Sequence, residues 1–149
     1  MGTTTSSTLD RRLVDAAAAL WAADLQVRAM RDATRGGVAA VLHEWSESCG
    51  LTISVEESRI PVTPEIRGVC EVLGLDPLHV ANEGTMVVSV PGDSASAALE
   101  VLRKFPQTSA AVRIGQVVQL KSAPVVVRRA LEREMPLDEP IGAPLPRIC

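Results

Sequence analysis

The last residue of this 149-residue chain is a cysteine, and it ends a proline-rich segment, residues 135–149. Proline fixes φ and removes a backbone donor, so the segment is predicted to be an extended, flexible tail and neither a helix nor a central strand. At about 3.1 Å per residue, such a tail would reach roughly 40 Å. A thiol on a semi-rigid arm is suited to be modified at one site and carried to another.

The chemistry of Cys149 itself favours a passive role. Its own α-carboxylate is a nearby like charge and disfavours the thiolate, so another site must activate or load the sulfur. Cys149 is therefore interpreted as a substrate cysteine. The alternative is a chance terminal cysteine. The other two cysteines, Cys49 and Cys70, fall on apolar stripes of predicted helices and are expected to be buried. Three cysteines without a Cys/His cluster predict neither a disulfide framework nor a metal site.

A second candidate site is the segment from Asp32 to Gly37, which follows a predicted strand and opens a predicted helix. Backbone N–H groups of Gly36 and Gly37, with the guanidinium of Arg35, would suit an anion such as phosphate. Alternatively, the glycines only permit a tight strand-to-helix turn. In that case Asp32 and Thr34 are local turn and cap residues.

A third candidate is the loop that contains Asn82 and Glu83, just before a predicted strand over residues 85–90. Glu83 is proposed as a proton acceptor or as the carboxylate that orients the tail, with Asn82 beside it. Ordinary turn chemistry is the alternative. His43 is expected on the solvated face of its helix. His79 could reach the same cleft as Glu83, but a packing role is preferred.

The elements that must position these residues predict an α+β fold, a mixed sheet covered by helices. The apolar spacing predicts helices and strands in roughly the order α-β-α-β-α-β-α-β-β-β. Residues 1–7 are predicted to be a disordered lead, residues 8–134 the α+β domain, and residues 135–149 the tail. Helices are expected near residues 9–23, 38–49, 64–73 and 94–105. Strands are expected near residues 25–30, 51–55, 85–90, 111–114, 116–120 and 125–129.

Composition excludes several classes of function. The formal net charge is −3 and only 2% of residues are aromatic, so a nucleic-acid partner is not expected. No run approaches the roughly 20 apolar residues that span a bilayer. The apolar run of residues 14–23 imitates a signal peptide, but Asp15 interrupts it, which favours a surface helix. A cytoplasmic protein with no membrane partner is expected.

Three segments carry a family resemblance. The ending Leu145-Pro-Arg-Ile-Cys149 resembles the C-terminal signature of the HypE family of hydrogenase maturation proteins. Residues 30–37, MRDATRGG, resemble that family's MRDPTRGG segment, with Ala33 in place of proline, a change expected to loosen the loop. Residues 74–84, from GLDPL to ANEG, resemble a third family segment. The Arg-Gly-Gly segment alone is shared with aminoimidazole ribonucleotide synthetases and selenophosphate synthetases, whose C-terminal domains have the expected fold.

The resemblance implies a function for the whole family protein. HypE proteins accept a carbamoyl group on the terminal cysteine from HypF, and use ATP with Mg²⁺ to dehydrate it to a thiocyanate. The cyano group then passes to the HypC–HypD complex for [NiFe]-hydrogenase. The chain matches only the family's second domain, so the chain alone is expected to bind no ATP and to be inactive. A docking and acceptor module, or another enzyme of the superfamily, are the alternatives. A homodimer stays open.

Overall fold

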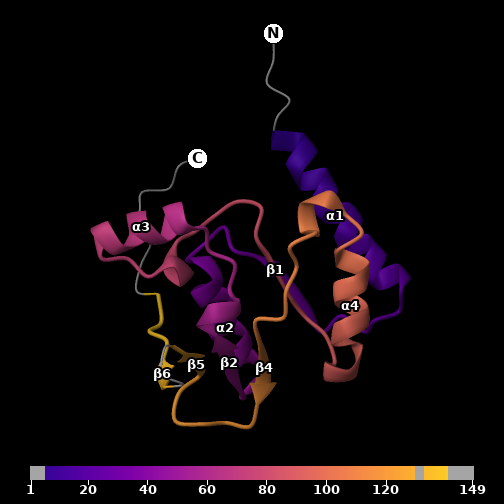
Figure 1. Cartoon of the computed structure of the whole chain (residues 1–149). Coiled ribbons are helices and arrows are strands. Elements are labelled where there is room, and N and C mark those ends of the chain that lie inside the picture. Colours follow the sequence, from indigo (N-terminus) through magenta and orange to yellow (C-terminus); the bar gives the residue numbers. More distant parts are fainter. Residues whose placement is uncertain (1–5, 130–132, 141–149) are drawn as a thin grey trace. The chain divides into compact units, whose positions relative to one another are not determined.

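The computed structural model describes residues 6–129 and 133–140 of the chain (Figure 1). The described residues form two compact units, one from residues 6–31 with 86–113 and one from residues 32–85 with 114–129 and 133–140. The elements, in chain order, are α1 Ser6–Ala22, β1 Ala29–Asp32, α2 Gly37–Cys49, β2 Thr52–Glu56, η1 Glu57–Arg59, α3 Pro64–Leu73, η2 Pro77–His79, β3 Met86–Ser89, η3 Gly92–Ser94, α4 Ala95–Leu102, η4 Pro106–Thr108, β4 Gly115–Val118, β5 Val125–Arg128 and β6 Glu134–Pro136.

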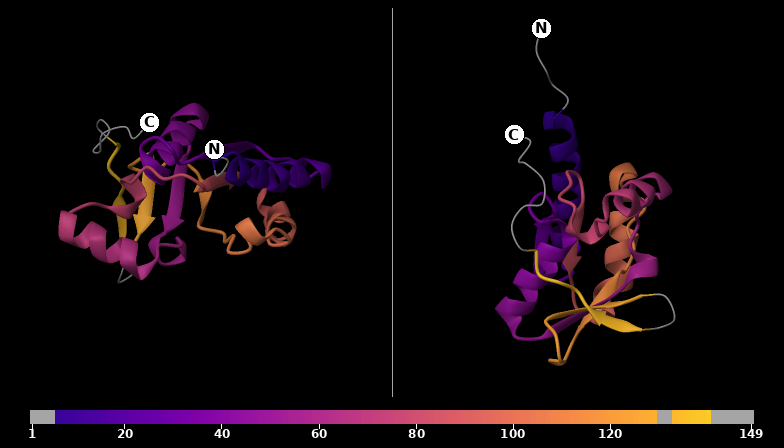
Figure 2. Two further views of the ribbon diagram at one scale, coloured as in Figure 1. Left: turned by 90° about the horizontal axis from the view of Figure 1, so that it is seen from above. Right: turned by 90° about the vertical axis from the view of Figure 1, so that its left-hand side faces the viewer.

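The first unit is built on two helices, α1 and α4, which lie side by side (Figures 1 and 2). Their apolar faces meet at Ala16, Leu20, Ala98 and Leu102, all at least nine-tenths buried. Strands β1 and β3 pair as a two-stranded sheet. Apolar side chains of that sheet, among them those of Met86 and Val88, pack against the helical cluster. Removal of this apolar surface from water stabilises the unit.

Two strands differ from expectation here. The predicted strand over residues 25–30 begins later, at Ala29, because Asp24 and Gln26 take left-handed backbone conformations with φ of 52° and 49°. The predicted central strand over residues 85–90 is β3, which belongs to the two-stranded sheet. Its continuous apolar sequence reflects packing against the helical cluster and does not reflect a central position in a large sheet.

The second unit contains a four-stranded sheet in the order β4-β2-β5-β6. Strands β2 and β5 are parallel, with Ile53 opposite Val125, whereas β4 and β6 run antiparallel to their neighbours. Helix α2 contacts β2 and β5 (Figure 1). This mixed sheet with helices confirms the predicted α+β class. Figure 2 shows β6 beside β5 at one edge of the sheet, where proline is tolerated in a strand.

Helix α2 follows its predicted apolar stripe. Val38, Val41 and Leu42 are buried, and Gly50 ends the helix with φ of 68°. The expectation for Cys49 is wrong: it is exposed, because it lies in the last turn. At that end the chain turns towards β2, and the Ser46 hydroxyl donates to the carbonyls of Leu51 and Pro124.

Helix α3 has the predicted ends but not the predicted inner face. The Thr63 hydroxyl accepts a hydrogen bond from the N–H of Ile66 at 3.4 Å, and Gly74 ends the helix with φ of 66°. Cys70 is buried as expected. The rest of the predicted face is exposed because no described element covers it: Ile66, Val69 and Leu73.

The segment over residues 111–114, predicted to be a strand, is irregular. The guanidinium Nε of Arg103 donates to the carbonyl of Ala111 at 3.0 Å, and the N–H of Ala111 donates back to Thr108. These local bonds compete with a strand ladder for the backbone of Ala111. No described helix is long and apolar enough to cross a membrane.

Candidate functional site

The loop from Asp32 to Gly37 joins β1 to α2. Gly36 and Gly37 both have left-handed backbones, with φ of 65° and 67°. The Thr34 hydroxyl donates to Asp32 Oδ1 at 2.8 Å, as in a local turn. Helix α2 begins with no side-chain cap hydrogen bond. The N–H groups of its first turn are therefore not satisfied by the capping residue, and such groups suit an anion.

Gly37 is required by a close approach of two backbones. A Cβ at this position would lie 2.8 Å from the Val80 oxygen and would also overlap the Leu78 oxygen. Gly37 therefore brings the start of α2 into direct contact with the η2 segment. This contact supports the turn-and-packing interpretation of Gly37.

The loop that holds Asn82 and Glu83 is bonded to the first loop through Ala33. The N–H of Ala33 donates to the Thr85 oxygen at 3.0 Å, and the Ala33 oxygen accepts from the N–H of Asn82 at 3.1 Å. A proline at position 33 could not make the first of these bonds, so alanine adds a tie where we expected a looser loop. In these two bonded loops, the side chains of Asn82, Glu83 and Arg35 are exposed.

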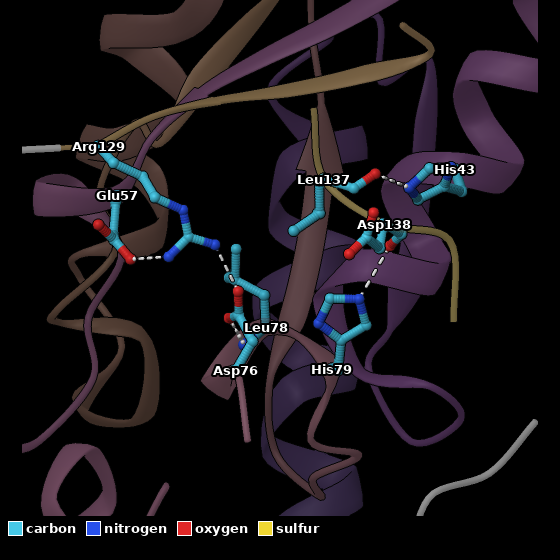
Figure 3. Close-up of polar contacts among 8 residues, drawn as sticks. All are labelled: His43, Glu57, Asp76, Leu78, His79, Arg129, Leu137 and Asp138. Carbon is cyan, nitrogen blue, oxygen red and sulfur yellow. Dashed lines mark hydrogen bonds and ion pairs between the residues drawn. The ribbon is translucent and has the colours of Figure 1, made fainter. Parts of the chain in front are cut away.

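An ion-pair cluster fixes the start of η2. Asp76 accepts the N–H of Leu78 at 2.9 Å through Oδ1 and the guanidinium of Arg129 at 2.5 Å through Oδ2 (Figure 3). Arg129 also pairs with Glu57 at 2.7 Å. The hydrogen bond that Arg129 donates to Asp76 raises the pKa of Arg129, against the effect of its partial burial. This cluster ties the η2 segment to the end of β5.

The root of the predicted tail is docked. Met135 and Pro136 lie in β6. The Leu137 side chain is buried, and its N–H donates to the Val125 oxygen at 3.0 Å. Pro140 then lies beside Gly36, 3.6 Å from the position of a Cβ there. The rest of the predicted tail, including Cys149, falls outside the described residues.

Two histidines hold this root by its backbone. His43 Nε2 lies 3.0 Å from the Leu137 oxygen, and His79 Nε2 lies 2.8 Å from the Asp138 oxygen (Figure 3). A carbonyl oxygen only accepts, so each Nε2 carries the proton and donates. The expectation that His43 is merely solvated is wrong, and His79 has a polar partner in addition to any packing role. Nothing in the sequence signalled these contacts, because their acceptors are backbone atoms.

Three segments that are distant in sequence thus meet at one place, which we call the motif junction: residues 32–37, 76–85 and 137–140. The predicted residues Asp32, Thr34, Arg35, Gly36, Gly37, Asn82 and Glu83 all belong to it. Among the described residues, no group of three or more His, Cys, Asp or Glu side chains could hold a metal ion. The exposed guanidinium of Arg35 and the start of α2 could bind a phosphate, and the exposed carboxylate of Glu83 could accept a proton.

The chain is similar to known proteins in both sequence and structure. Residues 4–128 match the family described as AIR synthase related protein, C-terminal domain. The carbamoyl dehydratase HypE of Escherichia coli is 46% identical over 123 residues, which cover 83% of this chain and 36% of that protein. A crystal structure of E. coli HypE matches with a TM-score of 0.83 and 44% identity, covering 92% of this chain and 42% of that one.

Two further solved structures contain a partner or ligand. A chain of a crystal structure of a HypE–HypF complex matches with a TM-score of 0.75 and 34% identity, covering 82% of this chain and 39% of that chain. A HypE in complex with ATP matches with a TM-score of 0.71 and 37% identity, covering 79% and 37%. The chain spans about a third of the length of its curated relatives. Because residues 4–128 match its model, the chain belongs to the family of AIR synthase related proteins and carries the C-terminal domain of that family, and two relatives that each align with 83% of it are HypE proteins.

Proposed function

We propose that this chain is the acceptor domain of a HypE-type carbamoyl dehydratase, with Cys149 as the residue on which the cyano group is made. HypF would transfer the carbamoyl group to the Cys149 sulfur. After dehydration, the cyano group would pass to the HypC–HypD complex as an iron ligand of [NiFe]-hydrogenase. The observation that carries the proposal is the docked tail root: the arm that bears the cysteine begins beside Gly36, at the motif junction.

The chemistry requires help with a poor leaving group. In the S-carbamoyl group, the amide oxygen would attack the γ-phosphate of ATP, releasing ADP and giving an O-phosphorylated imidate with the loss of one N–H proton. Loss of phosphate and of the second N–H proton then leaves S–C≡N. The products are the thiocyanate, ADP, phosphate and released protons, so no oxidant or reductant is needed.

The motif junction contains groups that could bind the phosphate and groups that could accept the N–H protons. Arg35 and the uncapped first turn of α2, which starts at Gly37, would contact a phosphate. Glu83 would accept an N–H proton or orient the loaded tail, with Asn82 beside it. No described cluster fits the magnesium ion that accompanies ATP, so no step is assigned to the metal.

Intact-mass spectrometry tests the acceptor role. The chain is incubated with HypF, carbamoyl phosphate and ATP. We expect a mass gain of one carbamoyl group that localises to Cys149 and disappears in Cys149→Ala. Cys49→Ser is the matched control, because Cys49 is exposed whereas Cys70 is buried, so nonspecific modification would occur at Cys49. A folded chain that gains no carbamoyl group would support the docking module and refute the acceptor role.

A second experiment tests the proton acceptor. The chain is joined to the first domain of a HypE protein, and the loss of one water from the carbamoylated product is followed. Glu83→Gln should slow dehydration by roughly 100-fold or more while carbamoylation persists, as expected for the loss of a general base. An unchanged dehydration rate removes Glu83 from the mechanism.

A further inference from the structure

Two imidazoles from different elements converge on adjacent carbonyls of one backbone segment. His43 extends from α2 and His79 ends η2, yet they bond the consecutive oxygens of Leu137 and Asp138 (Figure 3). These bonds join the tail root to the two elements that also meet at Gly37. We call His43, His79 and the two carbonyls they bond the tail clasp.

The tail clasp lies where a fixed strand becomes an arm. On its N-terminal side, β6 pairs with β5, and Leu137 is buried with its N–H bonded to Val125. On its C-terminal side, Asp138 and Glu139 are exposed, and Pro140 lies beside Gly36. Among the described residues, the clasp is therefore the last side-chain hydrogen bond to the chain before Pro140.

We propose that His43 and His79 are positioning residues that set the pivot of the cysteine-bearing arm at the Gly36 turn. The nine residues from 141 to 149 then span at most roughly 30 Å, at about 3.1–3.6 Å each. Cys149 is held within that radius of the proposed phosphate-binding loop, which raises its effective concentration there. The value of this placement rests on the proposed function, but the clasp itself can be tested without it.

Release of the clasp has a calculable consequence. If the carbonyls of Leu137 and Asp138 lose their donors, Leu137 becomes the last attached residue, and the proposed flexible tail lengthens from the nine residues 141–149 to the twelve residues 138–149. The r.m.s. span of a flexible arm rises with the square root of its length, here by about 15%. The direction in which the arm leaves the unit is also lost.

The natural cysteines provide the measurement. Cys49 is exposed and Cys149 ends the arm, while Cys70 is buried, so nitroxide labels can be attached to the first two. Pulsed electron paramagnetic resonance gives the distribution of distances between them. We expect His43→Phe with His79→Phe, which keeps ring size but removes the donors, to broaden the distribution by about 15% or more.

The matched control is His43→Gln with His79→Gln, whose side-chain amides retain an N–H donor, and it should keep the narrower distribution. Circular dichroism confirms that each variant is folded. Identical distributions in the folded phenylalanine variant and the unaltered chain would overturn the proposal. So would glutamine variants as broad as the phenylalanine ones, because the donors would then be irrelevant.

A measurement on the unaltered chain tests the clasp even if the phenylalanine variant does not fold. Proton–nitrogen spectra of the imidazoles should show Nε2–H signals of His43 and His79 that exchange slowly with water. The absence of both signals contradicts the clasp. The mass experiment on Cys149 is independent of the distance measurement. If Cys149 is not carbamoylated but the clasp variants behave as expected, the proposed function is refuted and the clasp stands. If Cys149 is carbamoylated but the phenylalanine variant leaves the distances unchanged, the clasp is refuted and the proposed function stands.

Discussion

At the scale of single residues, three glycines have the same backbone conformation for different reasons. Gly36, Gly37 and Gly50 all have φ between 65° and 68°. Nothing lies within 4 Å of the position of a Cβ at Gly50, whereas a Cβ at Gly37 would overlap the backbone oxygens of η2. Gly50 is therefore a helix cap, while Gly37 is a contact between two of the three segments of the motif junction.

Gly37→Ala should consequently destabilise the chain far more than Gly50→Ala. In both variants the left-handed backbone conformation lowers the free energy of unfolding by about 1 kcal/mol. Only Gly37→Ala adds an overpacking cost of roughly 1–3 kcal/mol. Urea unfolding of the two variants measures the difference in free energy of unfolding. Equal losses in the two variants would mean that η2 moves away without cost and that the close approach is not required.

At the scale of elements, β6 is the point at which a proline-containing segment becomes part of a sheet. Glu134 begins the strand and accepts two hydrogen bonds from the Lys121 ammonium, at 2.8 and 3.0 Å, with Arg128 at 3.7 Å. These cations lower the pKa of Glu134, the hydrogen bond with Lys121 being the largest cause. Both side chains of the ion pair are accessible to water, so the pair specifies where β6 begins more than it stabilises the sheet.

Lys121→Gln should raise the pKa of Glu134 towards the ordinary glutamate value. Because the folded pKa is lowered, the contribution of the pair is present above the unfolded pKa and is lost as the pH falls through the folded pKa. A nuclear magnetic resonance titration of the Glu134 carboxyl measures the shift. Lys104→Gln, at an exposed lysine of the other unit, should leave it unchanged. If Lys121→Gln does not move the titration, the pair does not exist in solution.

At the scale of the whole molecule, the second unit is assembled from parts that are far apart in the chain. Its central strands β2 and β5 pair although some 70 residues separate them, as in Ile53 opposite Val125. Strand β6 and the buried Leu137 then cover the outer edge of β5. The residues that begin the tail are thus part of the folded unit, and the predicted boundary at residue 135 divides a strand.

Two truncations separate these roles. A chain that ends at Pro140 keeps β6, Leu137 and the clasp, and should unfold at nearly the temperature of the full chain. A chain that ends at Arg133 loses the buried Leu137 and exposes the β5 edge, which should cost roughly 2–5 kcal/mol and lower the midpoint by roughly 5–15 °C. Calorimetry or thermal circular dichroism compares the two. Equal midpoints would show that the tail root adds nothing to the folded unit.

Much of the organisation followed from local sequence. Thr63, Gly74 and Gly50 mark helix ends through caps that involve only nearby backbone. The class of fold and the family resemblance rest on periodicity and on three ordered segments, which the comparisons support. Predictions failed where distant contacts decide burial, as on α3 and at Cys49.

The sequence by itself thus determined the helix caps and the fold class, because these depend on residue type and short spacing, and it predicts a proline-rich arm that carries Cys149. Only the tertiary structure decided that residues 32–37, 76–85 and 137–140 meet, and that His43 and His79 hold the root of the arm. The physical reason is that each of those hydrogen bonds uses a backbone N–H or C=O group on at least one side, and because nearly every residue carries these groups, they leave no pattern in the sequence.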